Sequence, residues 1–357
     1  MRGTVNVSPK ISVVIPSYNY GKYLRQCVRS AAEQPGVDHE VVIVENASTD
    51  GSLDIARSLA NEYPNVRLVS FTSNEGIIAS INRCWSEVRG EYGVLLCADD
   101  LLTSGSLARS LAFMEFHPNV GLVFGPTDAF LGDDAPTETA DAMSESPPVI
   151  HSGEAWITER CRSGRNPIFT PEAMIRTEVL RKVGGANPEL PYTSDLNLWL
   201  RIASETDVAY LAGHLQALHR RHPSNYSVAY LRNVLMEMQQ IWAAFEQFFL
   251  TVASHPKRAE WEMLVRKSLA KEIRYRAARE FSLAGGGSAS SDYKPLLVFA
   301  YTLDPAISSR AGREFAWAIR VRMGPRAANL MPTLWVARIH RLLQRYLWKR
   351  RARRMGI

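Results

Sequence analysis

The chain has 357 residues, of which 46% are hydrophobic and 22% are charged, so it can bury a large core and is not a disordered protein. No apolar run is long enough to predict a transmembrane helix. The formal net charge is +6, but eleven Lys and Arg residues and no acidic residue follow Glu314, which leaves a net charge of −5 on the rest of the chain. This distribution favours a basic tail that binds a surface over a basic active site.

The cysteines are widely scattered and show neither a CxxC pair nor zinc-type spacing: Cys27, Cys84, Cys97 and Cys161. Such a pattern is typical of reduced thiols and not of a disulfide framework. The first residues of the chain are polar and do not resemble a secretory signal. We therefore expect a cytoplasmic protein.

The N-terminal part of the chain alternates between apolar segments of strand length and amphipathic segments of helix length. Strands are expected at 11–16, 41–44, 66–70 and 92–97, and helices at 20–34, 52–62 and 74–89. Strands that alternate with helices of this length predict βαβ units. The sequence therefore predicts an α/β fold with a Rossmann-like, mostly parallel sheet.

The pattern changes in the second half. We expect a strand at 120–124, a loop in the acidic stretch 133–145, a strand-like segment at 169–175, and helices at 177–183 and 193–204. Gly184 and Gly185 end the first of these helices. Further helices are expected at 230–253, 258–284 and 295–301, with a flexible glycine-rich break at 285–288. A helical C-terminal region is therefore predicted to follow the α/β domain.

Two adjacent carboxylates, Asp99 and Asp100, follow the apolar segment Val94–Ala98. The carboxyl ends of parallel strands form the ligand-binding edge of an open α/β sheet. Carboxylates there offer hard oxygen ligands to Mg²⁺ or Mn²⁺. The alternative is that the pair caps a helix starting at Asp100 or Thr103, because Asp is a favoured N-cap residue. These residues alone leave both interpretations open.

Polar residues also follow the other expected strands. The tetrapeptide PSYN at 16–19 offers an aromatic ring and an amide to a flat base, although it also favours a simple turn. Glu45 ends the second strand, at the sheet edge where Asp99 is expected. There is no GxGxxG and no phosphate-cradling loop, so neither a dinucleotide site nor a P-loop is supported.

Two residues of the second half have a functional and a structural interpretation. Asp195 lies in the first turn of the helix expected at 193–204, where a carboxylate stabilises the helix dipole or performs chemistry. His222 follows Arg220 and Arg221 in an expected loop. A histidine there contacts phosphate or metal, or has no function, as is common for loop histidines.

Taken together, five segments resemble the family-2 inverting glycosyltransferases of the GT-A fold, over roughly residues 10–228. They are ISVVIPSYNYGKYL from Ile11, EVVIVENASTDGSLDIA from Glu40, NEGIIASIN from Asn74, VLLCADDLL from Val94 and PYTSDLNLWLRIA from Pro191. The resemblance implies a GT-A-type sheet flanked by helices. It also implies a metal-dependent hexosyltransferase that moves a sugar from a nucleotide-diphosphate donor to an acceptor hydroxyl with inversion.

The resemblance implies roles for individual positions. Asp99 matches the metal-binding carboxylate, for Mg²⁺ or Mn²⁺, and Asp195 matches the catalytic base. Donor-nucleotide binding is implied for Pro16, Ser17, Tyr18, Glu45, Asn74, Asp100 and His222. The donor is expected to be UDP-, dTDP- or GDP-linked, and the acceptor a glycan or lipid-linked glycan in bacterial cell-surface polysaccharide or glycolipid synthesis.

The chain departs from the family pattern at three positions. Cys97 and Glu45 each stand where the family often has Asp, and Ser194 replaces a frequent Glu. Cys97 supports the alternative of a catalytically degenerate scaffold that binds a nucleotide sugar, whereas Asp99 and Asp195 oppose it. A nucleotidyltransferase would need a glycine-rich basic loop after the first strand, which residues 17–21 do not match.

The tail completes the predicted organisation, with a GT-A domain at 1–228, a helical region at 229–330 and a basic amphipathic helix at 331–357. On helical spacing the tail has one apolar face and one face with Arg338, Arg341 and Arg345. This composition is typical of a helix on anionic lipid, which would place the protein at the inner face of the membrane. The alternative is a helix that packs on its own domain. No nucleic-acid-binding module is recognised, so no nucleic-acid partner is expected.

Overall fold

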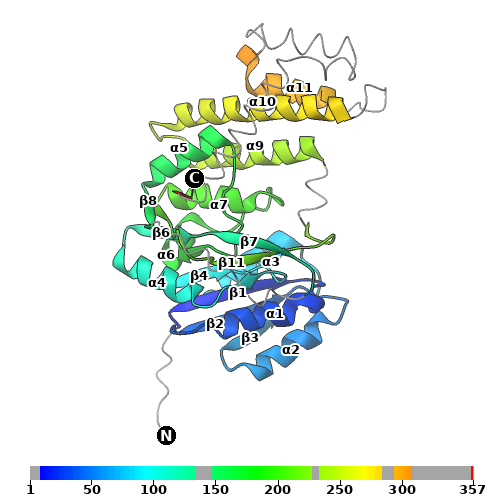
Figure 1. Cartoon of the computed structure of the whole chain (residues 1–357), viewed down its shortest axis with the longest axis vertical. Helices are drawn as coiled ribbons and strands as arrows, with labels where there is room; N and C mark the ends of the chain where they lie inside the picture. The colour runs from blue at the N-terminus through cyan, green and yellow to red at the C-terminus, as the bar shows by residue number, and fades with distance from the viewer. Residues whose placement is uncertain (1–8, 134–146, 227–232, 284–292, 308–354, 357) are drawn as a thin grey trace. The chain divides into compact units, whose positions relative to one another are not determined.

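The computed structural model describes residues 9–133, 147–226, 233–283, 293–307 and 355–356 (Figure 1). These residues form two compact units. The first contains the described parts of 1–156, 166–225 and 353–356, and the second contains those of 157–165 and 226–352. The domain limits expected at 228 and 330 stay predictions. The tail helix expected at 331–357 lies outside the described residues, apart from 355–356.

The first unit is built on an eight-stranded sheet. Its strands are β1 Ile11–Ser17, β2 His39–Glu45, β3 Val66–Ser70, β4 Tyr92–Leu95, β6 Val120–Phe124, β8 Val149–His151, β9 Met174–Arg176 and β10 Asp207–Tyr210. They lie in the order β3-β2-β1-β4-β9-β6-β10-β8. The pairs β3–β2, β2–β1, β1–β4 and β6–β10 are parallel, whereas β9 and β8 pair antiparallel with their neighbours. The predicted mostly parallel sheet is therefore confirmed.

Continuous burial explains why these apolar segments form interior strands. In β1 the side chains of Val13, Val14 and Ile15 are fully buried, and so is the whole run Val41–Val44 in β2. A strand covered on both faces carries an unbroken apolar run instead of an alternating one. Each fully buried side chain of this size contributes about 1.5–3 kcal/mol relative to an exposed one.

Helices connect the strands of this sheet. They are α1 Gly21–Ala32, α2 Ser52–Glu62, α3 Ile77–Ser86, α4 Ser106–Phe116, α5 Gly153–Ser163, α6 Thr177–Val183 and α7 Ser194–Ala203. In α1 the buried positions recur at helical spacing, as predicted: Leu24, Cys27, Val28 and Ala31. The predicted stop of α6 is also confirmed, because Gly184 takes a φ of 81° and its N–H bonds to the carbonyl oxygen of Leu180.

A second, three-stranded sheet lies in the order β5-β11-β7, formed by β5 Leu101–Leu102, β7 Thr127–Leu131 and β11 Ala217–Arg221. Strand β11 runs antiparallel to β5 and parallel to β7. Leu218 pairs with Leu101, and Arg220 pairs with Phe130. This sheet was not predicted. It brings Arg220 to Asp100 although 120 residues separate them along the chain.

The helix-cap interpretation of the carboxylate pair is wrong. Strand β5 follows directly after Asp100, and α4 begins only at Ser106, with Gly105 as its N-cap residue. Gly105 takes a left-handed φ of 72°, which glycine adopts without a steric cost. The Thr103 hydroxyl, also considered as a helix start, donates to the carbonyl oxygen of Leu215 instead.

Two other expected segments differ in extent, and two more lie outside the described residues. The helix expected at 74–89 is limited to α3, because a turn at Asn74 and Gly76 precedes it. Of the strand-like segment expected at 169–175, only β9 is a strand. The loop expected at 133–145 and the glycine-rich break at 285–288 lie outside the described residues, apart from Asp133.

The second unit is helical, as predicted. It contains α9 Val234–Thr251, α10 Arg258–Leu283, α11 Tyr293–Leu303 and the 3₁₀ turn η1 Pro305–Ile307. Aromatic side chains form its core, where the rings of Phe248 and Trp261 lie 6.2 Å apart. The indole N–H of Trp261 donates to Oγ1 of Thr158 at 2.9 Å, which satisfies the buried nitrogen.

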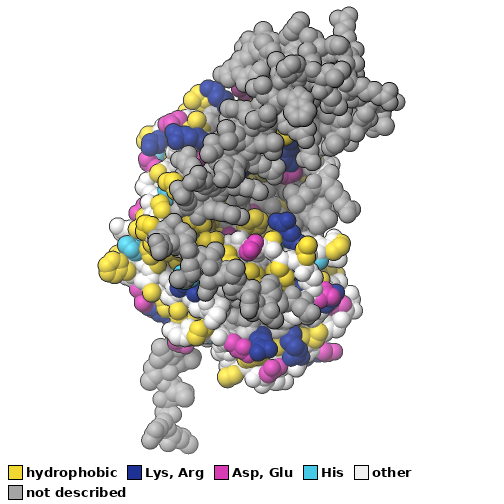
Figure 2. All heavy atoms as spheres, in the orientation of Figure 1, with side chains coloured by type: hydrophobic (Ala, Val, Ile, Leu, Met, Phe, Trp, Pro, Cys, Tyr) yellow, Lys and Arg dark blue, Asp and Glu magenta, His cyan; other side chains and the backbone are white. Residues whose placement is uncertain are grey.

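Hydropathy and surface charge bear on possible partners. No helix in the described ranges combines the length and apolar content that a membrane span needs. On the face shown in Figure 2, acidic and basic side chains of the described residues are interspersed.

Candidate active site

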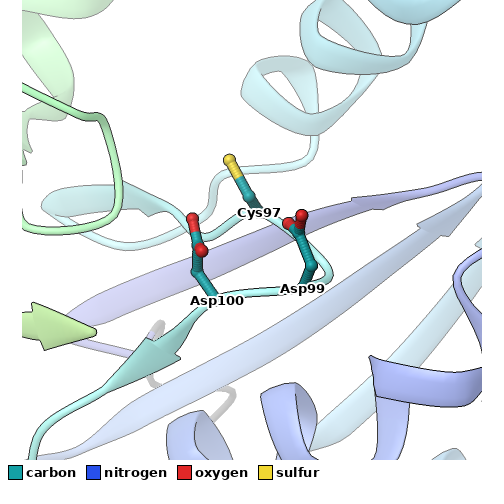
Figure 3. A group of neighbouring side chains, drawn as sticks. All are labelled: Cys97, Asp99 and Asp100. Carbon is teal, nitrogen blue, oxygen red and sulfur yellow. The ribbon is translucent and has the colours of Figure 1, made fainter. Parts of the chain in front are cut away.

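The loop after β4 carries three potential metal ligands. Ligand atoms of Cys97, Asp99 and Asp100 all lie within 4.8 Å of one another, and their side chains point to the same side of the loop (Figure 3). Asp99 is 7% exposed and Asp100 is 1% exposed, whereas Cys97 is half-buried. The N–H of Asp100 donates to the carbonyl oxygen of Cys97 at 3.0 Å and closes the turn. The backbone thus holds all three side chains together.

Asp99 is held through one of its two carboxylate oxygens. His222 Nε2 lies 3.0 Å from Asp99 Oδ2, and Asn225 Nδ2 donates to the same oxygen at 2.9 Å. Asn225 Oδ1 accepts the N–H of His222, and the ring of Tyr23 lies 4.8 Å from the imidazole. Within the described part of the chain, Asp99 Oδ1 has no hydrogen-bond partner.

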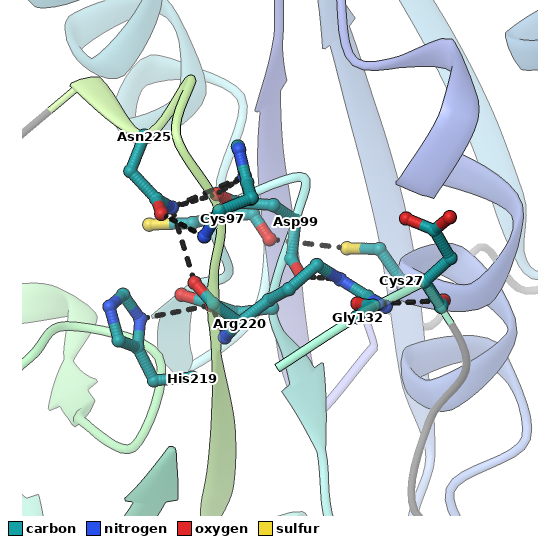
Figure 4. A network of polar contacts seen from close by, with 10 residues as sticks. Cys27, Cys97, Asp99, Gly132, His219, Arg220 and Asn225 are labelled. Carbon is teal, nitrogen blue, oxygen red and sulfur yellow. Dashed lines mark hydrogen bonds and ion pairs between the residues drawn. The ribbon is translucent and has the colours of Figure 1, made fainter. Parts of the chain in front are cut away.

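Asp100 is held in the same way by β11, whose residues His219 and Arg220 are labelled in Figure 4. Its Oδ1 accepts the backbone N–H of Arg220 at 2.9 Å and lies 3.0 Å from His219 Nδ1. Among the described residues, Oδ2 of Asp100 has no partner. Each carboxylate therefore presents one fixed oxygen and one free oxygen.

The buried side chain of Arg220 supports the loop that carries the carboxylates. Its side chain is fully buried, and its guanidinium lies 4.7 Å from the ring centre of Tyr23 and 4.5 Å from that of Phe130. The guanidinium donates to four acceptors at 2.7–2.9 Å: the carbonyl oxygens of Asp99, Gly132 and Asp133 and Oε1 of Gln26. The sequence placed Arg220 only in a loop beside His222.

Burial and like charge favour a cation at this site. The pKa of Asp99 is raised, first by burial and then by the neighbouring charge of Asp100, while the hydrogen bond from His222 lowers it. The pKa of His219 is raised, chiefly by its bond to Asp100. A divalent cation would compensate both carboxylates. The free oxygens of Asp99 and Asp100 fit such an ion, since Mg²⁺ and Mn²⁺ prefer oxygen ligands.

The expected nucleotide-binding residues of the first two loops form a second group. Glu45 is fully buried, and its two carboxylate oxygens accept the N–H groups of Ala47 and Ser48 at 3.0 and 2.8 Å. Asn46 Nδ2 donates to Oδ1 of Asn74 at 3.1 Å. Glu45 therefore shapes the loop after β2, from which Asn46 contacts Asn74.

The residues after β1 offer one ring and one hydroxyl. The Tyr18 side chain is 38% exposed. Ser17 is buried, and its Oγ has no hydrogen-bond partner among the described residues. Pro16 precedes them as the penultimate residue of β1 and is partly buried. An exposed ring beside an unsatisfied hydroxyl is suited to a planar, polar ligand.

Asp195 lies in the first turn of α7 and is half-buried. Its Oδ2 accepts a hydrogen bond from Asn166 Nδ2 at 2.8 Å, and its Oδ1 accepts the N–H of Leu196 at 2.7 Å. Burial raises the pKa of Asp195 to about 6, although these hydrogen bonds lower it. A carboxylate with this pKa is ionised at neutral pH and is basic enough to accept a proton. No sequence motif predicted a role for Asn166.

The segment 166–172 connects Asp195 to the carboxylate pair. After Asn166, the N–H of Phe169 donates to Oε1 of Glu172 at 2.6 Å. The Phe169 ring is 55% exposed and stacks on His219 with 5.6 Å between ring centres. His219 in turn pairs with Asp100. The candidate base and the candidate metal ligands thus belong to one connected arrangement of side chains.

Comparisons with known proteins identify the domain that carries Asp99 and Asp100. Residues 12–182 match the family Glycosyl transferase family 2. An uncharacterized glycosyltransferase of Nostoc sp. is 32% identical over 181 residues, which are 50% of this chain and 54% of that protein. The chain spans between 43% and 67% of the length of three of its curated relatives.

Solved structures agree on the fold. Staphylococcus aureus TarS 1–349 in complex with UDP-GlcNAc has a TM-score of 0.61 at 17% identity, covering 84% of this chain and 82% of that one. The mannosyltransferase PcManGT of Pyrobaculum calidifontis, in complex with GDP-Man and Mn²⁺, has a TM-score of 0.54 at 19% identity, covering 84% and 86%. The resemblance predicted from the sequence is confirmed: the chain carries a glycosyl transferase family 2 domain at residues 12–182 and has the GT-A fold of nucleotide-sugar glycosyltransferases.

Proposed function

We propose that the protein is a metal-dependent, inverting glycosyltransferase that moves a sugar from a nucleotide-diphosphate donor to an acceptor hydroxyl. One observation carries the proposal. At the carboxyl end of β4, in a glycosyltransferase domain, Asp99 and Asp100 each have one oxygen fixed by β11 or its following loop and one oxygen free for a cation.

The donor side is assigned to Asp99 and Asp100. Asp99 would hold Mg²⁺ or Mn²⁺, which would supply Lewis-acid neutralisation of the charge on the leaving diphosphate. His222 and Asn225 keep the Asp99 carboxylate oriented by fixing Oδ2. Asp100 faces the donor beside the ion. The Mn²⁺ and GDP-Man bound to the similar mannosyltransferase support a cation and a nucleotide sugar here.

The acceptor side is assigned to Asp195. An alcohol is a poor nucleophile until a base within hydrogen-bond reach removes its proton. Each oxygen of Asp195 accepts one hydrogen bond, from Asn166 or Leu196, and retains a lone pair for the acceptor hydroxyl. A base on the face opposite the leaving group produces inversion at the anomeric carbon.

The donor nucleotide is assigned to the loops after β1, β2 and β3, with Pro16, Ser17, Tyr18, Glu45 and Asn74, and to His222. Its base is uracil, thymine or guanine. The UDP-GlcNAc bound to TarS supports a nucleotide sugar of this class. The acceptor is a glycan or lipid-linked glycan of bacterial cell-surface polysaccharide or glycolipid synthesis. Peripheral membrane contact through the tail stays a prediction, because the tail lies outside the described residues.

A thermal-shift experiment tests the donor site. Wild type, Asp99→Ala and the control Asp54→Ala, which changes an exposed helix residue, are each mixed with UDP-, dTDP- or GDP-sugars with and without Mn²⁺. We expect one nucleotide class to raise Tm only with Mn²⁺, in wild type and the control but not in Asp99→Ala. Stabilisation that persists in Asp99→Ala, or none with any nucleotide, would contradict the proposed site.

Catalysis is tested with Asp195→Asn. The variant should still bind the donor with Mn²⁺ but lose transfer, because an amide cannot accept the proton. Full transfer by Asp195→Asn would contradict its role as base. Donor binding without transfer in wild type, across a panel of glycan acceptors, would instead favour the nucleotide-sugar-binding scaffold.

A further inference from the structure

Cys97 differs from the other cysteines of the chain in its surroundings. Cys27, Cys84 and Cys161 are buried, whereas Cys97 is half-buried and its sulfur belongs to the cluster with Asp99 and Asp100. Its backbone is fixed, because its carbonyl oxygen accepts the N–H of Asp100 at 3.0 Å and the S–H of Cys27 at 3.3 Å. A cysteine that only filled the core would have no reason to lie beside two carboxylates.

The free atoms of the cluster form a mixed ligand set. Hydrogen bonds fix Oδ2 of Asp99 and Oδ1 of Asp100. In the described part of the chain, Asp99 Oδ1, Asp100 Oδ2 and Cys97 Sγ have no hydrogen-bond partner. His222, which is 8% exposed at its side chain, orients Asp99 toward the same place. One oxygen from each carboxylate and the sulfur of Cys97 lie within 4.8 Å of one another.

The distances suit one ion. Oxygen ligands lie about 2.0–2.2 Å from a divalent transition metal and thiolate sulfur about 2.3 Å from it, so two opposite ligands are about 4.4 Å apart. The cluster atoms, within 4.8 Å of one another, need only a small adjustment to reach this spacing. Magnesium demands hard oxygen ligands, whereas borderline cations accept sulfur and oxygen together.

We infer that Cys97 Sγ is a direct ligand of the cation, and that the site therefore selects a thiolate-accepting divalent transition metal, such as Co²⁺ or Zn²⁺, over Mg²⁺. This inference rests on the proposed function and refines its metal site. Binding forms a metal–sulfur bond, breaks the S–H bond and releases the thiol proton to solvent. The replacement of a frequent Asp by Cys97 then changes which metal is bound and does not remove a ligand.

Cobalt absorption tests the inference without relying on activity. Co²⁺ is titrated into the full-length protein in the presence of UDP or GDP, and the near-ultraviolet thiolate-to-cobalt charge-transfer band is measured. We expect the band in wild type and in the control Cys84→Ala, and its loss in Cys97→Ser and Asp99→Asn. Thermal unfolding of each variant shows whether it is folded.

A variant that replaces the Cys97 thiol with a carboxylate tests the inferred metal selectivity. Cys97→Asp completes an all-oxygen set, so the ratio of Mg²⁺ to Co²⁺ affinity measured by calorimetry should rise by about tenfold or more over wild type. An unchanged ratio would contradict the inferred selectivity.

The outcomes separate the two proposals. Co²⁺ binding that Asp99→Asn abolishes, with no thiolate band or with the same band in Cys97→Ser, would overturn the role of Cys97 and leave the proposed function intact. No cation binding by wild type with either nucleotide would overturn the metal-dependent function and the inference together.

Discussion

The hydrogen bond from Asn166 to Asp195 is one of the contacts that lower the pKa of the proposed base, so we predict that Asn166→Ala changes the pH dependence of transfer. Asn166 Nδ2 lies 2.8 Å from Asp195 Oδ2 and stabilises the carboxylate form. Removing this donor leaves burial as the dominant influence and raises the pKa of Asp195 above its value of about 6. Because the base acts as a carboxylate, the acid limb of the pH profile should move to higher pH.

The size of the shift follows from the bond. A hydrogen bond to a charged group contributes about 1.5–3 kcal/mol, and one pKa unit corresponds to about 1.4 kcal/mol. Because water replaces part of the lost bond, we expect a rise of about one pH unit. At pH 6.5 the ionised fraction of Asp195, and with it kcat/KM, should then fall about threefold, whereas at pH 8.5 the variant should nearly match wild type.

The assay is kcat/KM for transfer across pH 5.5–9, with donor saturating and acceptor varied. Asn187→Ala is the matched control, since the Asn187 side chain makes a local turn contact with the N–H of Glu189. The control should keep the wild-type profile. An Asn166→Ala profile that is lower at every pH by a constant factor would refute the reasoning, because it would show lost positioning without a change in the pKa of Asp195.

Two further predictions concern stability. Burial raises the pKa of Glu172 to about 8 from an ordinary value of 4.5, so the folded state binds its proton more tightly and this stabilisation is lost as pH rises through 8. Glu172→Gln should therefore reduce the drop in Tm between pH 6 and pH 9, and an equal drop in both proteins would contradict this. Arg220→Lys should lower the free energy of unfolding by about 3 kcal/mol in urea, since an ammonium cannot reach all four acceptors or stack between two rings. Arg221→Lys, on the exposed neighbour, should have little effect, and equal losses would contradict the role of Arg220.

The N-terminal half of the fold could be predicted because its signals are local. Unbroken apolar runs identified β1 to β4 and β6, and helical spacing identified α1 and α2. The extents of α2, β3, β6 and α6 agree with the predicted ranges, because turn residues such as Gly51 and Gly184 delimit two of them. In these segments propensity, periodicity and burial all favour the same structure.

The small sheet could not be predicted because its strands lack such a signal. Strand β11 has the sequence ALHRR, in which polar side chains follow two apolar ones, and β5 has two residues. What stabilises β11 is pairing with residues about a hundred positions earlier. A similar separation hid Asn225, which bonds to Asp99 across 126 residues. Asn166 bonds to Asp195 across only 29 residues, but its segment carries no periodic signal.

The contacts around Asp99 and Asp100 could not be predicted from the local sequence pattern. The same two residues carry negative charge that their neighbours compensate only in part. Asp99 and Asp100 are adjacent, buried carboxylates, and like charges at that depth destabilise a fold unless donors oppose them. Among the described residues, Arg220, His222 and Asn225 contact one oxygen of each carboxylate, and His219 lies 3.0 Å from Asp100. A cation that binds the folded state supplies the missing positive charge on the other side and stabilises the protein by mass action. The imbalance that makes this loop unfavourable on its own is therefore the physical reason to expect a metal there.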